Sequence, residues 1–221
     1  MHVVAVVVAG SSRALTPVAD VPMVVRAVRA LLRSALVDRV IVVAADALRP
    51  EIDRVCASAP VDVRSPEALH RIGAHTVQRR DGAGSDDLVT ASGDDIVVLH
   101  DACRPLAPAE LATAVVGAVR GGHGIAVPIL PLTDTVKSVD DRGAVIGTPD
   151  RTALRVLQTP VAVRAGALPP DAFENPLAAI RRVAAAGGDV GTVAGHPAAF
   201  AVRSAWDLEL AELIADGRIR L

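Results

Sequence analysis

The first part of the chain alternates short apolar runs with segments of helical periodicity. Val3–Ala9 is an apolar, mostly β-branched run, which is typical of a parallel strand buried on both faces. In Pro22–Ser34 apolar residues recur at helical spacing with arginines opposite them, and a proline suits the first helical turn. Further strands are expected at Arg39–Ala44, Val61–Val63, Ile96–Leu99, Gly124–Val127, Val190–Val193 and Ala199–Val202, and further helices at Asp46–Ser58, Pro108–Arg120, Asn175–Ala186 and Ser204–Asp216.

This order of strands and helices predicts a Rossmann-like α/β sheet, mostly parallel, in a single domain over residues 1–221. Between 129 and 160 the pattern changes to short Thr/Val alternations, broken by the turn signal Asp140-Asp141-Arg142-Gly143. We therefore predict a β-hairpin arm that protrudes from the main sheet.

Two helix starts carry capping signals. Asp46 is expected to be the N-cap of the helix that follows it. Ser204, with Asp207 three residues later, resembles a capping box.

Composition excludes several classes of protein. The 221 residues are 51% apolar with a net charge of −2, so the chain has no excess positive charge that would favour binding to nucleic acid or to an anionic membrane. With two Phe, one Trp and no Tyr, the chain also lacks aromatic platforms for single-stranded nucleic acid. The apolar start at 2–9 is too short to span a bilayer and lacks the basic flank of a signal peptide. Two cysteines make no disulfide framework and have no metal-ligand spacing, so we expect a reducing, cytoplasmic location.

Two predicted strand ends carry residues suited to phosphate chemistry. Gly10-Ser11-Ser12-Arg13 follows the first strand, where backbone amides of a small-residue turn can face a phosphate; the alternative, which the local residues by themselves favour, is an ordinary strand-to-helix turn. A second motif is Leu99-His100-Asp101-Ala102-Cys103-Arg104-Pro105. It places the carboxylate of Asp101 at the carboxyl end of another predicted strand, where open α/β sheets bind ligands. Asp101 could hold Mg²⁺ on a triphosphate and Arg104 a second phosphate; the alternative is a helix cap paired with an arginine.

The arm carries a third group of polar residues. Thr135 and Lys137 lie on one side of the predicted hairpin and Arg151 on the other, while Gln158-Thr159-Pro160 closes it. These side chains either form an anion pocket or are the solvated face of a hairpin. Cys103 has no evident histidine partner, so nucleophilic catalysis is not supported.

Together these motifs resemble the 2-C-methyl-D-erythritol 4-phosphate cytidylyltransferase family. The matches are 99–105 with the family's V-H-D-A-A-R-P, 131–137 with P-x-x-D-T-x-K, 148–151 with T-x-D-R, 158–160 with Q-T-P, and 206–212 with the C-terminal E-D-L-x-L-A-E. The resemblance implies a nucleotidyltransferase that binds CTP and Mg²⁺ and transfers CMP to a sugar-alcohol phosphate, with residues 129–160 as the arm of a homodimer.

The resemblance also assigns roles to residues. Arg13 and Arg151 would be catalytic. Ala9, Gly10, Ser11, Arg80 and Asp101 would bind the nucleotide, with Asp101 also the Mg²⁺ ligand. Arg104, Thr135, Lys137 and Thr159 would bind the substrate phosphate.

The sequence departs from the family on the nucleotide side. Most of the glycine loop after the first strand is missing, and Arg13 falls where the family has a lysine or the loop arginine. Of the segment that recognises cytosine, only Arg80 is retained, and the C-terminal lysine falls on Ala201. Since Arg is a bulkier cation than Lys between phosphates, we expect impaired or lost catalysis. An active cytidylyltransferase, a non-catalytic binding paralogue and a transferase with a changed nucleotide or acceptor remain alternatives.

Overall fold

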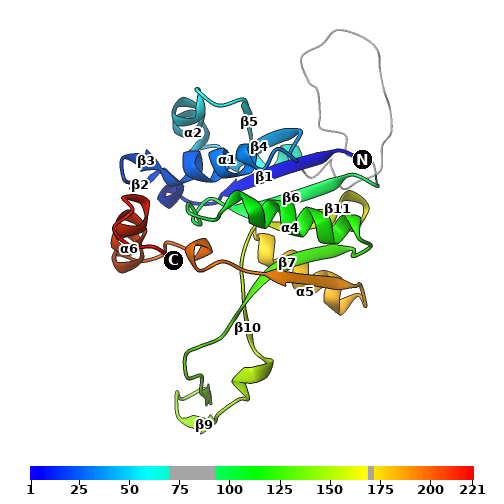
Figure 1. The fold of residues 1–221 in the computed structure, drawn as a ribbon, viewed down its shortest axis with the longest axis vertical. Helices are drawn as coiled ribbons and strands as arrows, with labels where there is room; N and C mark the ends of the chain where they lie inside the picture. Colours follow the sequence, from blue (N-terminus) through cyan, green and yellow to red (C-terminus); the bar gives the residue numbers. More distant parts are fainter. Residues whose placement is uncertain (70–92, 169–171) are drawn as a thin grey trace.

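The computed structural model describes residues 1–69, 93–168 and 172–221 (Figure 1). Arg80 lies outside the described residues. The helices are α1 Met23–Arg33, α2 Arg49–Cys56, α3 Pro66–Leu69, α4 Ala109–Arg120, α5 Pro176–Ala185 and α6 Ala205–Ala215, with 3-10 turns η1 Ser12–Leu15, η2 Arg151–Ala153, η3 Ala165–Ala167 and η4 Pro197–Ala199. The strands are β1 Val3–Ala9, β2 Pro17–Val18, β3 Val21–Pro22, β4 Arg39–Ala44, β5 Val61–Arg64, β6 Ile96–Asp101, β7 Ile125–Pro131, β8 Ser138–Val139, β9 Val145–Gly147, β10 Arg155–Leu157, β11 Val161–Arg164 and β12 Val190–Ala194.

The main sheet confirms the predicted α/β architecture. Its strand order is β10-β7-β11-β6-β1-β4-β5, with β12 paired to β7. The pairs of β1 with β4 and β6, of β4 with β5, and of β12 with β7 are parallel. Strand β11, which the sequence pattern did not predict, is antiparallel to β6 and β7 because the chain enters it directly from the arm.

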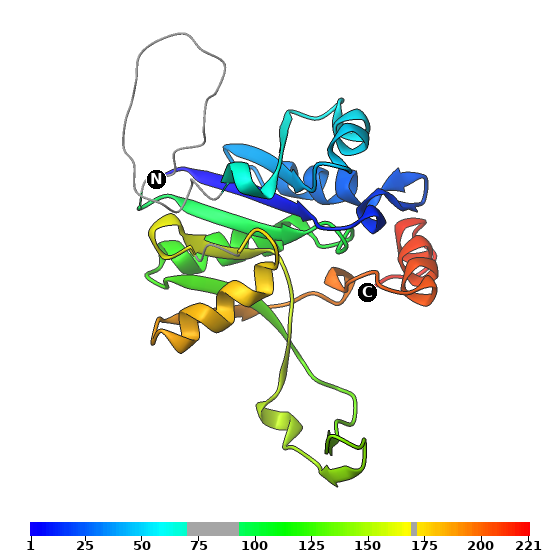
Figure 2. The ribbon, with the colours of Figure 1, turned by 180° about the vertical axis from the view of Figure 1, so that it is seen from behind.

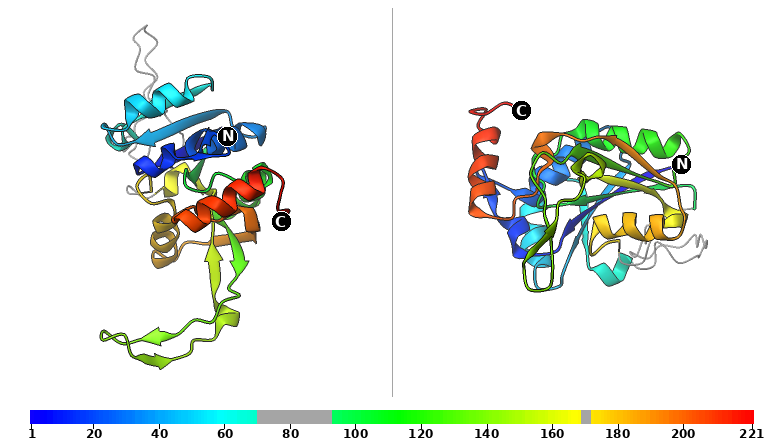
Figure 3. Two further views of the ribbon diagram at one scale, coloured as in Figure 1. Left: turned by 90° about the vertical axis from the view of Figure 1, so that its left-hand side faces the viewer. Right: turned by 90° about the horizontal axis from the view of Figure 1, so that it is seen from below.

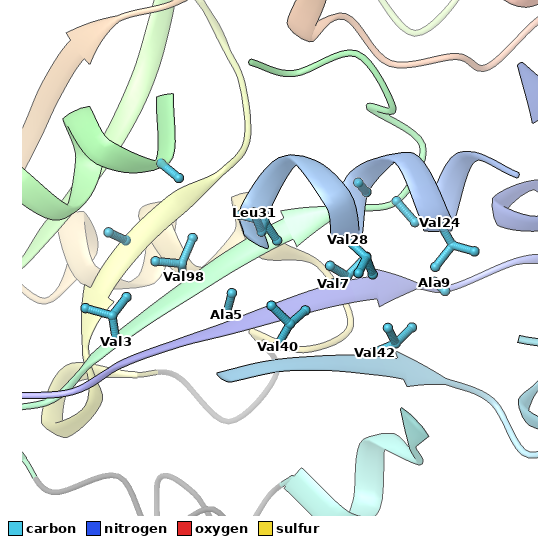
Figure 4. Close-up of a cluster of buried hydrophobic side chains, with 14 of the residues drawn as sticks. Val3, Ala5, Val7, Ala9, Val24, Val28, Leu31, Val40, Val42 and Val98 are labelled. Atoms are coloured by element: carbon cyan, nitrogen blue, oxygen red, sulfur yellow. The ribbon is translucent and has the colours of Figure 1, made fainter. Parts of the chain in front are cut away.

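Helices cover both faces of the sheet and bury the apolar run of β1. Its odd-numbered residues, from Val3 to Ala9, pack with Val24, Val28 and Leu31 of α1 in one core (Figure 4). Its even-numbered residues pack in a second core with residues of β6, β11 and α5, on the face seen in Figure 2. All seven residues of β1 are buried, which explains the absence of polar alternation in this segment.

The predicted arm leaves the sheet between β7 and β10, whose antiparallel pairing forms its base (Figure 3). Strands β8 and β9 pair at its end. The turn between them is the predicted one: Oδ1 of Asp140 accepts hydrogen bonds from the amides of Arg142 and Ala144, and Gly143 has a φ of 81°. That φ lies in the left-handed region that glycine adopts without strain.

Two predictions of local structure were wrong and one was confirmed. Asp46 is not an N-cap, since α2 begins at Arg49 and Asp46 instead forms an ion pair with that residue. Residues 199–202 form no strand, since Pro197 starts the 3-10 turn η4 and no ladder follows. The capping box of α6 is present between Ser204 and Asp207.

Within the described residues, no helix has both the length and the apolarity needed to cross a membrane.

Candidate nucleotide site

The candidate site lies where β1 and β6 end side by side. Val8 is in register with Asp101, so the Gly10-Ser11 turn and the Asp101 carboxylate share one edge of the sheet. β1 also pairs with β4 on its other side, so the strand order reverses at this point. The carboxyl ends of strands at such a switch point form the usual ligand crevice of open α/β sheets. The predicted residues Ala9, Gly10, Ser11 and Asp101 are therefore brought together.

Asp101 is held rigidly at the end of β6. Its Oδ1 accepts a hydrogen bond from the amide of Cys103 at 2.8 Å, and its own amide donates to Thr159 Oγ1 at 3.1 Å. The next amide, of Ala102, donates to the carbonyl of Val8 at 3.0 Å and ties the turn to β1. These bonds fix the direction of the carboxylate and leave Oδ2 outside them.

Thr159 and His100 form a buried polar pair beneath this carboxylate. Thr159 is fully buried, His100 is 1% exposed, and Thr159 Oγ1 lies 3.0 Å from Nδ1 of His100. Burial lowers the pKa of His100, although the charge of Asp101 acts in the opposite direction. At neutral pH His100 is therefore an uncharged support for the site.

Arg104 connects three distant parts of the chain. It is 5% exposed, and its guanidinium donates to the carbonyl of Ala199 at 2.5 Å and to that of Leu157 at 3.3 Å. Burial lowers the pKa of Arg104, while the Asp101 carboxylate raises it. Arg104 thus links the Asp101 turn to the base of the arm and to the C-terminal segment. Two of its donors are engaged by protein carbonyls, not directed at a ligand.

The C-terminal segment lies against the same turn. The amide of Val202 donates to the carbonyl of Cys103 at 2.8 Å, and the Val202 side chain is buried with Val18 and Met23. Arg203 follows Val202 directly and is exposed.

Two exposed arginines lie in segments next to the Asp101 turn: Arg13 in η1, just after β1, and Arg203 directly after Val202. Burial raises the pKa of the Cys103 thiol to about 11, with Asp101 acting in the same direction, while the charges of Arg13 and Arg203 both act to lower it. The raised pKa keeps Cys103 a thiol at neutral pH, which agrees with the absence of a nucleophilic role.

Arg203 is a site residue that was not predicted from the sequence. The resemblance places the family's C-terminal lysine on Ala201, where no cation is present. The signal that could have found Arg203 is its position only two residues after Ala201.

The predicted arm residues form a separate group. Lys137 Nζ donates to Thr148 Oγ1 at 2.6 Å, and the Arg151 guanidinium donates to the carbonyl of Thr133 at 3.0 Å. Thr135 is exposed nearby in sequence. These bonds join the two sides of the arm, which extends away from the sheet (Figures 1 and 3). Of the predicted residues Thr135, Lys137, Arg151 and Thr159, it is Thr159, at the foot of the arm, that bonds to the Asp101 turn.

The foot of the arm is also closed onto the C-terminal segment. Gln158 Nε2 donates to the carbonyl of His196 at 2.9 Å, and the His196 amide donates to Gln158 Oε1 at 2.9 Å. Gly195 lies so close to Gln158 that a Cβ added to Gly195 would be 2.4 Å from Gln158 Oε1. Any larger residue at position 195 would therefore clash with Gln158, and this contact sets the path of the chain toward Arg203.

The residues present fit one Mg²⁺ ion shared with a substrate. Within 1–69, 93–168 and 172–221 no cluster of three or more His, Cys, Asp or Glu forms an all-protein cage. Mg²⁺ is commonly held by one or two carboxylates together with substrate phosphates and waters. Asp101 provides such a carboxylate, with Oδ2 not used by the two bonds described above.

The fold is a Rossmann-like α/β sheet with a projecting arm, and the candidate ligand site lies at the carboxyl ends of its strands. Its architecture is similar to two solved structures. A 2-C-methyl-D-erythritol 4-phosphate cytidylyltransferase from Thermus thermophilus has a TM-score of 0.71 at 23% identity, covering 98% of this chain and all of the other. A 4-diphosphocytidyl-2C-methyl-D-erythritol synthase from Anaerococcus prevotii has a TM-score of 0.73 at 19% identity, covering 97% and 98%.

Sequence comparison specifies the family. A sequence model described as IspD, 2-C-methyl-D-erythritol 4-phosphate cytidylyltransferase, matches residues 6–216. A relative of that name from Nocardia farcinica is 37% identical over 216 residues, spanning 96% of this chain and 89% of the relative. Another, from Frankia casuarinae, is 38% identical over 209 residues, spanning 93% and 74%. The chain belongs to the 2-C-methyl-D-erythritol 4-phosphate cytidylyltransferase family.

Proposed function

We propose that this protein transfers the cytidylyl group of CTP to methylerythritol phosphate, or to a related sugar-alcohol phosphate, at low turnover. The observation that carries the proposal is the position of Asp101 at the end of β6, beside the end of β1, which leads to Arg13, and bonded through its turn to the segment that leads to Arg203. A carboxylate that can share a metal with phosphates, flanked by cations, is what a triphosphate site requires.

The chemistry follows from positioning and charge. An oxygen of the acceptor phosphate forms a bond to the α-phosphorus of CTP, the bond from that phosphorus to the bridging oxygen breaks, and diphosphate leaves. Arg13 and Arg203 would stabilise negative charge on the phosphates, and Thr159 would keep Asp101 in place through its amide. Mg²⁺ bound at Asp101 would supply further positive charge to the triphosphate.

Low turnover is proposed because few groups remain to hold the triphosphate. Only Gly10 and Ser11 separate β1 from η1, so the turn offers few backbone amides. Removal of one preorganised donor of this kind typically reduces turnover on the order of 10²–10³-fold. The same short turn favours a second candidate, a paralogue that binds nucleotide or a partner without catalysis.

We further propose that residues 129–160 are a dimerisation arm and that Thr135, Lys137 and Arg151 act in the site of a second copy. The apolar end of the arm supports this: Val139, Val145 and Ile146 are 56%, 64% and 67% exposed. Exposed apolar residues gathered on a projecting element are typical of an interaction surface.

The deciding experiment measures diphosphate release from CTP, Mg²⁺ and methylerythritol phosphate, beside the Nocardia farcinica relative. We expect slower release than from the relative, and loss of the residual rate in Asp101→Asn. A matched control is Asp94→Asn, in the segment before β6 and away from the strand end. Release that is absent in the parent protein, with CTP still bound in calorimetry, would support the non-catalytic candidate instead.

A further inference from the structure

One face of α1 carries three arginines that the proposed function does not use. Arg26, Arg29 and Arg33 follow the i, i+3, i+7 spacing that places side chains on one side of a helix. At a rise of 1.5 Å per residue, the first and last are roughly 10 Å apart along the axis. All three line a cavity of about 230 Å³, whose other walls are Val21 and the segment 105–108.

These cations have no carboxylate within ion-pair distance in the part of the chain that the structure describes. Arg26 is partly buried and fixed: Nε donates to the carbonyl of Val18 at 2.8 Å and Nη2 to that of Ala19 at 3.4 Å. Nη1 takes part in neither bond. Arg29 and Arg33 are exposed at the mouth of the cavity.

The pKa of Arg26 reflects the positive charges of the neighbouring arginines on α1. Its pKa is lowered first by burial and next by the charges of Arg29 and, to a smaller extent, Arg33, and only Asp216 acts in the opposite direction. Like charges held this close repel one another in the absence of an anion. A bound anion would remove that repulsion and take up the unused guanidinium donors.

The shape of the cavity limits the size of the anion. Sites for drug-sized ligands are about 300–1,000 Å³, so this cavity suits something smaller. A guanidinium pairs with phosphate through two parallel hydrogen bonds, and three such groups along the helix require more than one phosphate. Pro105 and Pro108, which also line the cavity, restrict the backbone of this part of its wall.

From these observations, we propose that the α1 face and the 105–108 segment form a binding site for a small polyphosphate anion of the size of inorganic diphosphate. The site is separate from the candidate nucleotide site, because Asp101, Arg13 and Arg203 do not line this cavity. It is nevertheless next to it in the chain, since Arg104 directly precedes the cavity wall. The proposal does not depend on cytidylyl transfer.

The test separates the two sites by calorimetry with inorganic diphosphate, without divalent metal and at constant ionic strength. The starting protein is the variant Arg13→Gln/Arg203→Gln, which removes the exposed cations of the nucleotide site. We expect it to bind one diphosphate. Adding Arg29→Gln/Arg33→Gln should weaken binding by roughly tenfold or more, since two charge-assisted contacts are lost. The matched control adds Arg120→Gln/Arg181→Gln, an equal loss of exposed charge on α4 and α5.

Four results would overturn the proposal. They are the absence of binding to the starting protein, equal affinity with and without Arg29 and Arg33, an equal loss in the control variant, and monophosphate binding as tightly as diphosphate. Equal melting temperatures of the variants verify that folding is unchanged. Since the readout is binding of diphosphate to a protein whose nucleotide site is already disabled, failure of the proposed catalysis leaves this result interpretable.

Discussion

Thr159 Oγ1 accepts a hydrogen bond from the backbone amide of Asp101 at 3.1 Å, across 58 positions of sequence. The amide belongs to the last residue of β6, where the sheet provides no further partner. Thr159, at the foot of the arm, therefore provides the hydrogen-bond acceptor for the last amide of β6, the strand that carries the Asp101 carboxylate. Any movement of the arm relative to the sheet would act on Asp101 through this bond.

The first prediction concerns this bond. Thr159→Val keeps the volume but removes the acceptor, so the Asp101 amide and His100 each lose a buried partner. We expect a loss of about 1–3 kcal/mol in the free energy of unfolding, measured by urea denaturation. Thr192→Val, the same change at an exposed position of β12, should alter it by less than about 0.5 kcal/mol. Equal effects of the two variants would contradict the role assigned to Thr159.

The second prediction is a pH dependence of stability caused by His100. Burial lowers its pKa from 6.5 to about 4, so the folded state binds the proton more weakly than the unfolded state. Its contribution to stability is therefore complete above pH 6.5 and is lost as the pH falls toward 4. His100→Asn should reduce the slope of unfolding free energy in this window by up to about 1.4 kcal/mol per pH unit. An unchanged slope would show that His100 is protonated in the folded protein.

The third prediction addresses Arg203. Arg203→Gln should lower kcat/KM for CTP by on the order of 10²-fold, because a cation near the transferring phosphate is lost. The control Arg218→Gln removes an exposed arginine after α6 and should leave the rate unchanged. We also expect Ala201→Lys to restore part of the rate lost in the Arg203 variant, since it returns a cation to the same segment. Restoration would not occur if Arg203 acted only on folding.

The fourth prediction concerns the end of the arm. Val145→Asp/Ile146→Asp places charge on its two most exposed apolar residues. If the arm docks on a second copy, sedimentation should show a dimer for the parent and a monomer for the variant, with melting of the main domain little changed. Trp206→Asp removes a comparably exposed apolar side chain from α6 and should not affect assembly. An identical mass for parent and variant would refute the dimerisation arm.

Strands and helices with strong periodicity were predictable because local pattern and tertiary environment agree in them. β1 is the clearest case, since its uninterrupted apolar run follows from burial by helices on both faces. β11 was missed because its four residues follow the predicted arm directly, and its pairing with β6 and β7 depends on segments far along the chain.

The candidate site was predictable only in part. The Asp101 turn and the hairpin turn are local, so their residues could be identified from spacing. The hydrogen bonds that hold the Arg104 side chain and the segment before Arg203 join residues far apart along the chain, such as Arg104 with Ala199 and Val202 with Cys103. A sequence pattern contains no information on such distant contacts.

The bonds from Arg104 to Ala199 and from Val202 to Cys103 have a consequence for biosynthesis. The ribosome makes β1 and β6 well before the segment that contains Ala199 and Val202. A nascent chain that ends before this segment would hold the carboxylate on a turn that lacks both of these bonds. The Asp101 turn would thus reach its final arrangement only after this later segment has been made.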